Sequence, residues 1–369
     1  MNMVKTERCP KCAHGQLFLT DLEFPRLVYC TNCNYEAPFA QALADTRKSK
    51  DKRLKRRLAR LILGMMVFSA AAVLFLLYGP YPGMRDLYVT TAMTTFNHQF
   101  LAKALYSEQQ IQDIMARNKV IEPPVNSDPA AIPPASERPD NIELIDIVKP
   151  EFRGYLLKVS NPARVAVGTC ADLGQSGMKL PEIIQRYHAV AGINGGAFAD
   201  PEGKGSGGVP GGIVIENGQI RYQEQGVQAF SVIGFDRNNV LVLGTYTLSE
   251  IQALGIRDAV SFRPFLIVNG VPAIIEGNGG WGIAPRTAIG QTKDGTVLML
   301  VIDGRQRGSI GASLKDVQEI MLEYGAYNAA NLDGGASSTL FYAGKIVNRP
   351  SSIFGDRTMP SAFIVKQQA

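Results

Sequence analysis

Residues 331–339 carry the sequence Asn-Leu-Asp-Gly-Gly-Ala-Ser-Ser-Thr, where a helical pattern of apolar residues gives way to a strand pattern. The stretch combines an amide, the carboxylate of Asp333, hydroxyls and two glycines. Glycine lets a backbone turn sharply and approach a ligand, and an acid beside it can act on a bond or hold a metal. We interpret Asn331–Thr339 as part of a functional site at the end of a buried strand.

Two further corners of the same kind lie upstream, each after an apolar run that is expected to form a buried strand. One is Asn194–Phe198 and the other is Asp303–Arg305. Asn-Gly and Asp-Gly are also the commonest hairpin turns, which is a sufficient explanation for any one corner alone. A shared cleft is favoured because no returning strand follows Asp333 directly and because three arginines lie near these corners. These arginines are Arg286, Arg305 and Arg357.

The pattern between residues 142 and 369 alternates short apolar segments with two helical patterns, at Lys179–Tyr187 and Leu314–Tyr324. Turn sequences such as Asn217-Gly218 imply largely antiparallel pairing. The predicted fold class is α+β, with a mixed, largely antiparallel sheet and flanking helices. The expected strands are Tyr155–Val159, Val165–Thr169, Ala189–Ile193, Gly212–Ile215, Val232–Phe235, Val240–Gly244, Phe265–Val268, Thr287–Gln291, Val297–Ile302, Ser338–Tyr342 and Ala362–Val365.

Five motifs in this region resemble those of the phosphodiester glycosidase family, in the family's order. They are Asn194–Phe198, Pro285–Ala288, Ile302–Arg305, Asn331–Thr339, and Asp356-Arg357 before Met359–Ala362. Ala197 and Ala336 each replace a residue that is usual in the family. The resemblance implies a hydrolase that cleaves the bond between sugar C1 and phosphate in a sugar-1-phosphodiester.

The resemblance also implies roles for the site residues. Asp333 is the first candidate and Asp303 the second for the carboxylate that faces C1, as nucleophile or as base for water; if both face the sugar, their separation would indicate retention or inversion. Arg286, Arg305 and Arg357 suit a phosphate because a planar guanidinium binds two oxygens at once. The remaining substrate-binding candidates offer amides, hydroxyls or backbone N–H groups: Asn194, Gly195, Gly196, Asn331, Gly334, Gly335, Ser337 and Ser338.

Two other chemistries are disfavoured for this region. A Ser-His-Asp triad would have to use His188, the single histidine between residues 142 and 369, which stands at the start of a predicted strand. A divalent cation beside Asp303 and Asp333 is possible but less favoured, because no loop shows the periodicity of a calcium site.

The N-terminal segment predicts a structural zinc ribbon over residues 1–45. Cys9 and Cys12 form one pair, and Cys30 and Cys33 form a second pair after seventeen intervening residues. Two such pairs can place four thiolates at the corners of a tetrahedron and leave no open position for chemistry. Two disulfides are the alternative, but cysteines two apart are poor partners for each other, and the basic flank indicates a reducing compartment.

Residues 61–78 predict a transmembrane helix. They contain no charge, and at 1.5 Å per residue they span about 27 Å, enough to cross the hydrocarbon core. Residues 1–60 hold 13 Lys and Arg against 6 acids, and a basic flank stays cytoplasmic, so we expect a single-pass protein of the cell membrane with an extracellular catalytic domain. A cleaved signal peptide is disfavoured because sixty hydrophilic residues precede the span.

The complete predicted organisation has six parts: 1–45 zinc ribbon, 46–60 basic juxtamembrane segment, 61–78 transmembrane helix, 79–121 helical spacer, 122–141 Pro-rich linker, and 142–369 phosphodiester glycosidase-like domain. With 369 residues, of which 46% are hydrophobic and 19% charged, the chain is long enough for several units. Lys and Arg balance Asp and Glu in residues 142–369, at 20 each, so the net charge of +5 reflects the N-terminal segment.

These features favour a membrane-anchored exoplasmic phosphodiester glycosidase in the metabolism of exopolysaccharide or of a cell-envelope glycopolymer. Its expected partners are a sugar-1-phosphodiester or glycopolymer substrate, the membrane, and a cytoplasmic protein for the ribbon. The alternative is a non-catalytic glycan-binding or envelope assembly protein, with Ala197 and Ala336 marking a relaxed site. Nucleic acid is not expected as a partner, because the apolar span already explains the adjoining basic residues.

Overall fold

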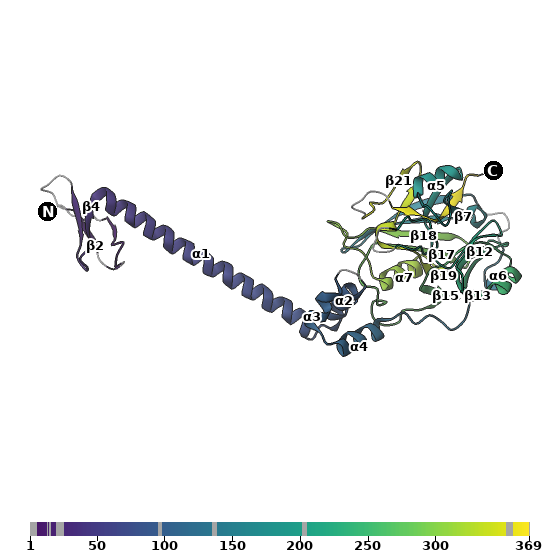
Figure 1. Ribbon diagram of the computed structural model, residues 1–369, viewed down its shortest axis with the longest axis horizontal. Helices are drawn as coiled ribbons and strands as arrows, with labels where there is room; N and C mark the ends of the chain where they lie inside the picture. Colours follow the sequence, from purple (N-terminus) through teal and green to yellow (C-terminus); the bar gives the residue numbers. More distant parts are fainter. Residues whose placement is uncertain are drawn as a thin grey trace. The chain divides into compact units, whose positions relative to one another are not determined.

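The computed structural model describes residues 6–12, 14, 16–19, 26–94, 98–134, 139–200, 205–351 and 357–368. The chain divides into two compact units, Met1–Tyr81 and Pro82–Ala369, which are described separately (Figure 1).

The N-terminal unit is a small antiparallel sheet followed by one long helix. Its strands, in sheet order, are β1 (Thr6–Arg8), β2 (Gln16–Leu19), β3 (Leu27–Cys30) and β4 (Glu36–Pro38). The buried residues of this sheet include two of the four cysteines together with Leu17 and Val28. So small an apolar core is marginal without a metal or disulfides, which agrees with the predicted ribbon.

The helix α1 (Phe39–Tyr78) runs without interruption from the basic segment into the apolar one. Its part Asp51–Tyr78 contains an 18-residue window with a mean hydropathy of 2.5, of which only 6% is buried. By length and composition this helix can cross a membrane, and no other described helix meets the same criteria. The apolar helix predicted at residues 61–78 is therefore the second half of a longer helix.

The C-terminal unit is built around a seven-stranded antiparallel sheet with the order β16-β15-β19-β17-β18-β6-β5. The strands β17 and β18 pair near the middle of this sheet. All six residues of β18 are apolar and buried. The strands are β5 (Ile142–Val148), β6 (Arg153–Val159), β15 (Phe265–Val268), β16 (Val271–Pro272), β17 (Arg286–Thr292), β18 (Val297–Ile302) and β19 (Ala326–Asn331).

Two five-stranded sheets complete the β structure. The first has the order β21-β20-β9-β23-β7, and the second has the order β11-β10-β14-β12-β13. Their strands are β7 (Val165–Thr169), β9 (Ala189–Asn194), β10 (Ile213–Glu216), β11 (Gln219–Gln223), β12 (Ala229–Asp236), β13 (Leu241–Thr247), β14 (Ile256–Val260), β20 (Leu340–Tyr342), β21 (Lys345–Ile346) and β23 (Ser361–Lys366), and a two-stranded ribbon pairs β8 (Met178–Lys179) with β22 (Thr358–Met359).

The core follows from the alternation of side chains along each strand. On one face of the seven-stranded sheet, residues such as Leu157 pack with Ile193 and Ile233 of the two five-stranded sheets. On the other face, residues such as Leu156 and Leu300 pack with the helix α7. The helices of this domain are α5 (Leu180–Arg186), α6 (Leu248–Ala253) and α7 (Leu314–Glu323). The observed α+β fold with antiparallel sheets confirms the predicted fold class.

The segment before the domain lies against it. It forms α2 (Pro82–Met93), α3 (Gln99–Leu105) and α4 (Glu108–Asn118). The Pro-rich stretch 122–141 is predicted to be an extended linker. Its described part forms hydrogen bonds with strands of the domain. The Ser127 N–H donates to the Leu243 carbonyl at 2.8 Å, and the Phe265 N–H donates to the Glu122 carboxylate at 2.9 Å. The described part of this stretch includes the short 3-10 helix Pro129–Ala131. Proline disfavours a longer α-helix here but leaves the other backbone groups able to pair with a sheet.

A core substitution tests this architecture. Leu300 is fully buried in β18, so Leu300→Ala should lower the free energy of unfolding by about 2–5 kcal/mol through lost burial and a residual cavity. The same change at Leu322, an exposed position of α7, should cost no more than about 0.5 kcal/mol. Denaturant titration of both variants measures the difference, and equal losses would contradict this assignment of the core.

Candidate active site

Antiparallel register brings three strand ends to one edge of the large sheet. Arg286, at the start of β17, pairs with Ile302, at the end of β18, and Ala288 pairs with Asn331, at the end of β19. Because β17 lies between the other two strands, the corners that follow Ile302 and Asn331 emerge together, beside the segment that leads into β17.

Hydrogen bonds and close packing join the corner Asn194–Phe198 to the corners at Asp333 and Asp303. The Asp333 N–H donates to the Gly195 carbonyl at 3.3 Å, and the Gly335 N–H donates to the Pro285 carbonyl at 2.9 Å. Pro285 also packs against the Asp303 corner, since a Cβ added to Gly304 would lie 2.7 Å from the Pro285 nitrogen. The structure thus gathers all three corners that the sequence singled out.

The Asp333 carboxyl group is the most strongly perturbed acid of this site. The pKa of Asp333 is raised to about 6. Burial is the main cause and nearby Asp200 adds to it, while a hydrogen bond from Ser337, the charge of Arg357 and the Gly334 N–H oppose the rise. A carboxylate with this pKa is ionised at neutral pH but more basic than usual, which suits proton transfer or attack on carbon.

Arg357 stands beside Asp333 but has a carboxylate partner of its own. Its guanidinium forms an ion pair with Asp200 and lies over the ring of Phe198 at 5.4 Å. Asp200 in turn accepts a hydrogen bond from the Gly205 N–H at 2.9 Å. Asp356, its predicted neighbour in the motif, and residues 201–204 lie outside the described residues. Asp200 was missed from the sequence, although it follows a quoted motif by two positions.

Arg286 is almost fully buried, with 4% of its surface exposed. Its Nε donates to the Ala312 carbonyl at 3.0 Å, and its Nη2 donates to the carbonyls of Trp281 at 2.8 Å and Gly282 at 2.6 Å. Burial and the charge of Arg305 lower the pKa of Arg286 to about 10. Among the described residues no carboxylate forms an ion pair with Arg286, so its charge is held mainly by carbonyl dipoles, with Asp316 as a more distant acid that favours it.

Arg305 supplies the second guanidinium of this pair. It adopts a φ of 57°, and its Nη2 would lie 3.5 Å from a Cβ added to Gly335, which itself has a φ of 62°. Glycine at position 335 therefore permits the turn, while the guanidinium lies at ordinary contact distance from this position. Two neighbouring guanidinium groups without an acid between them repel each other, and an anion placed there removes that cost.

The Asp303 side chain is engaged by protein groups. It accepts hydrogen bonds from Asn348 Nδ2 at 3.0 Å and from the Arg349 N–H at 2.9 Å, and only 6% of the residue is exposed. Burial raises the pKa of Asp303, and these hydrogen bonds oppose the rise. The arrangement indicates that Asp303 ties its corner to residues 348–349. Asn348 gave no signal in the sequence, because its partner lies 45 positions away.

Asn194 holds the Asp333 corner in place. Its Nδ2 donates to the Asp333 carbonyl at 2.5 Å, and its Oδ1 accepts from Thr287 Oγ1 at 2.8 Å and from the Thr339 N–H at 3.1 Å. These bonds occupy the amide that was expected to hold substrate. Asn194 therefore positions the Asp333 corner, while its contact with substrate stays a prediction. Thr287 is a partner that the sequence did not indicate.

Other predicted residues line the same corners with buried polar groups. Gly196 packs tightly, since an added Cβ would lie 2.6 Å from the Ser261 carbonyl oxygen. Among the described residues, five buried side-chain oxygens have no hydrogen-bond partner, and three of them lie at these corners: Asn331 Oδ1, Ser338 Oγ and Ser361 Oγ. An unpaired buried polar group costs about 1–3 kcal/mol, and such groups gathered at one place are typical of a site that binds a polar ligand.

The helix α2 contacts the loop that holds Arg286. Thr91 Oγ1 accepts from the Ile283 N–H at 3.1 Å, and Thr94 Oγ1 donates to the Trp281 carbonyl at 3.2 Å. The same Trp281 carbonyl accepts from Arg286. The spacer helix thus fixes the loop whose carbonyls hold the buried arginine.

In the N-terminal unit, the four cysteines form a cluster that can bind a metal. Their sulfur atoms all lie within 4.8 Å of one another, with 3.6 Å between Cys9 and Cys33 and 3.6 Å between Cys12 and Cys30. None of the four forms a disulfide. Four sulfurs at 2.3 Å from a tetrahedral zinc are separated by about 3.8 Å, so the donor set and its spacing fit zinc.

The C-terminal unit contains regions that are similar to a known family and to known proteins. The phosphodiester glycosidase family model matches residues 187–366. The chain is 43% identical over 67 residues to the SPbeta prophage-derived uncharacterized protein YomE of Bacillus subtilis (strain 168), covering 18% of this chain and 10% of that protein. It is 38% identical over 69 residues to the N-acetylglucosamine-1-phosphodiester alpha-N-acetylglucosaminidase of Bos taurus, covering 19% of this chain and 13% of that protein.

A solved structure shares the fold. The zebrafish N-acetylglucosamine-1-phosphodiester alpha-N-acetylglucosaminidase catalytic domain, auto-inhibited by its pro-peptide, superposes with a TM-score of 0.53 at 22% identity, over 66% of this chain and 88% of that one. The two proteins therefore share a fold. Residues 187–366 contain a phosphodiester glycosidase-like domain.

The contact of α2 with residues 281–283, which hold Arg286, is expected to affect phosphate binding. Thr91→Val removes the hydroxyl at constant shape, so it should lower the free energy of unfolding by about 1 kcal/mol and leave the Ile283 N–H without its partner. Because Arg286 depends on this loop, affinity for inorganic phosphate, measured by calorimetry, should fall severalfold. Met84→Ala, an exposed position of the same helix, is the control. Unchanged phosphate affinity in Thr91→Val would contradict the coupling.

Proposed function

We propose that the C-terminal domain hydrolyses the bond between sugar C1 and phosphate in a sugar-1-phosphodiester. One observation carries the proposal: the Asp333 corner, with its basic carboxylate, contacts the Arg305 guanidinium at Gly335, and Arg305 in turn acts on the buried charge of Arg286. A phosphodiester attached to a sugar presents a negative charge next to an electrophilic carbon, and this arrangement of charges matches it.

The proposed chemistry assigns one task to each group. Arg286 and Arg305 bind the phosphate oxygens and stabilise the charge that develops when the C1–O bond breaks. A phosphate monoester is a good leaving group, so strong acid assistance is not needed. Asp333 faces C1, as nucleophile or as base for water, and the oxygen of water ends on C1. Asp303, whose carboxylate is bound by Asn348 and the Arg349 N–H, positions its corner.

The names of the relatives support this substrate class. The bovine protein and the zebrafish catalytic domain are named for a glycosidase that acts on an N-acetylglucosamine-1-phosphodiester. The chain covers 13% of the bovine protein, so the transfer of substrate class to this chain is part of the proposal. A non-catalytic glycan-binding protein on the same fold is the alternative, and the assay below separates the two.

The apolar helix supports a location. We propose that α1 anchors the protein in the cell membrane, with the basic N-terminal unit in the cytoplasm and the glycosidase outside, since basic flanks stay inside. An exoplasmic enzyme of this class would act on exopolysaccharide or cell-envelope glycopolymer. The ribbon would then face the cytoplasm, where a protein partner is accessible to it.

The assay is release of reducing sugar from UDP-N-acetylglucosamine and related sugar-1-phosphodiesters by the full-length protein. Asp333→Asn should lower kcat/KM at least about 100-fold, because the amide cannot serve as base or nucleophile. In the wild type, the pKa of about 6 places the ionised, active form above pH 6. Activity should therefore be flat above that pH and fall about tenfold per unit below it.

Asp113→Asn, at an exposed position of α4, is the matched control and should keep full activity. Hydrolysis at the wild-type rate by Asp333→Asn would exclude the assigned role of Asp333. Binding of the diesters without turnover by the wild type would instead favour the non-catalytic alternative.

We also propose that the cysteine cluster holds a structural zinc, because four thiolates at tetrahedral spacing leave no position for substrate. The purified protein should contain about one zinc per chain, and Cys12→Ser should lose it together with the fold of the ribbon. Cys170→Ser changes the buried cysteine of the other unit and should retain the metal. Elemental analysis by mass spectrometry decides, and equal zinc in both variants would refute the assignment.

A further inference from the structure

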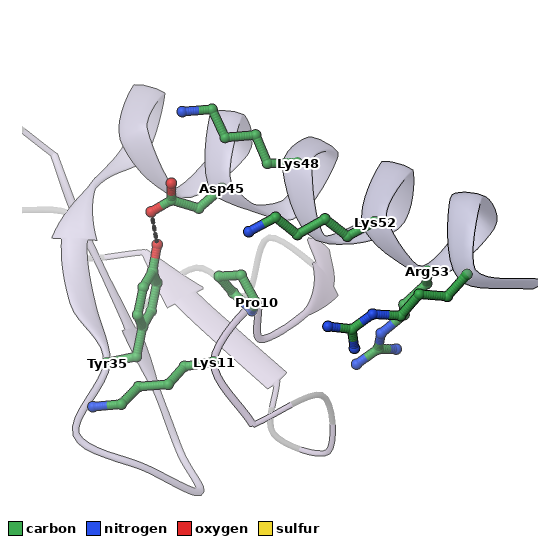
Figure 2. Close-up of a pocket in the computed structure, with 8 residues that line it drawn as sticks. Pro10, Lys11, Tyr35, Asp45, Lys48, Lys52 and Arg53 are labelled. Carbon is green, nitrogen blue, oxygen red and sulfur yellow. Dashed lines mark hydrogen bonds between the residues drawn. The ribbon is translucent and has the colours of Figure 1, made fainter. Parts of the chain in front are cut away.

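A hollow of about 500 Å³ lies between the first cysteine knuckle and the helix α1, within the N-terminal unit. In Figure 2 the side chains of Lys52 and Arg53 extend from the helix toward the knuckle that carries Pro10. The lining residues are Pro10, Lys11, Tyr35, Asp45, Lys48, Lys52, Arg53 and Arg56. Neither the proposed glycosidase nor the proposed zinc site uses this hollow.

The lining is strongly cationic. Five of its side chains are Lys or Arg, and Asp45 is the single acid. Asp45 already accepts a hydrogen bond from the Tyr35 hydroxyl at 2.9 Å (Figure 2). Within the described residues, none of the five cations takes part in an ion pair. The hollow therefore concentrates positive charge, with five cationic side chains against one acid.

The positions along α1 explain this concentration. Asp45, Lys48, Lys52 and Arg56 are spaced by three, four and four residues, so they share the helix face that borders the ribbon. Like charges at this spacing destabilise a helix by about 0.2–0.5 kcal/mol per pair. Lys55 and Arg57 carry the same charge on the same stretch but do not line the hollow. A basic membrane flank needs positive charge, whereas it does not need a walled recess.

We propose that this hollow binds a compact anion that carries two or more phosphate groups. Its volume lies in the range of small-molecule sites, and ammonium and guanidinium groups are the usual ligands of phosphate. The charges surround one recess instead of following a groove, which favours a small anion over a nucleic acid strand. Lys11 belongs to the cysteine knuckle, so the recess exists only when the knuckle is folded.

Two sources offer this chemistry: a soluble diphosphate compound and an acidic phospholipid headgroup. Arg56 precedes Leu61 by five residues, or about 8 Å along the helix, and Lys48 precedes it by thirteen, or about 20 Å. The headgroup layer on each side of a bilayer is only about 5–8 Å deep. A headgroup can therefore reach the Arg56 end of the hollow, while the Lys48 end extends into the aqueous phase.

Calorimetry with inorganic pyrophosphate tests the proposal, using full-length protein in neutral-lipid nanodiscs at a fixed salt concentration. The double variant Lys52→Ala/Arg56→Ala should bind pyrophosphate at least about tenfold more weakly than the wild type, since two charged contacts are lost. The control Lys55→Ala/Arg57→Ala removes the same charge from α1 outside the hollow and should change the affinity less than about twofold. Lys48→Gln provides a milder single change if the double variant loses its metal.

Equal weakening in the two double variants would overturn the proposal, because the charge would then act diffusely. Absence of pyrophosphate binding by the wild type would also overturn it, unless native mass spectrometry finds acidic phospholipid retained by the wild type and by the control but lost from Lys52→Ala/Arg56→Ala. That result would assign the hollow to a headgroup. Tighter binding of single-stranded DNA than of pyrophosphate, with the same loss in both double variants, would replace the compact anion by a polymer.

Discussion

The hydrogen bond from the Asn194 amide to the Asp333 carbonyl is the constraint on which the candidate active site depends. Asn194 ends a strand of a five-stranded sheet, whereas Asp333 follows a strand of the seven-stranded sheet. The amide oxygen binds Thr287 of the large sheet and the Thr339 N–H on the way back to the smaller one. One buried side chain thus links two sheets that share no edge, and the candidate active site lies where they are joined.

Charge is distributed unevenly around this junction. Arg357 is neutralised by Asp200, and the Asp303 carboxylate is satisfied by Asn348 and the Arg349 N–H, so these groups stabilise the folded protein as it stands. Arg286, Arg305 and Asp333 are less well compensated, as the lowered pKa of the arginines and the raised pKa of the acid show. Proteins tolerate such imbalance where a ligand corrects it.

The sequence predicted the α+β fold, the apolar helix and the cysteine cluster, because each depends on a local pattern of hydrophobicity, turns or cysteine spacing. It also named the residues that the structure gathers at the strand ends. It missed the bonds that Asn194 makes with Thr287, the partner of Asp303 and the contact of Thr91 with Ile283. The last of these joins residues 192 positions apart, and such contacts leave no trace in local periodicity. The chemical roles of the site residues stay predictions.

The continuity of α1 has a mechanical consequence. The helix contains no proline over its 40 residues, so the ribbon at one end and Tyr78 at the other belong to a single rod of about 60 Å. Helices of this kind bend gently, and sharp kinks occur at a proline, a bulge or a Gly/Ser pair. The one glycine of α1, Gly64, has no serine next to it. A rotation or tilt of the ribbon is therefore transmitted along α1 to Tyr78, with little loss through bending of the helix.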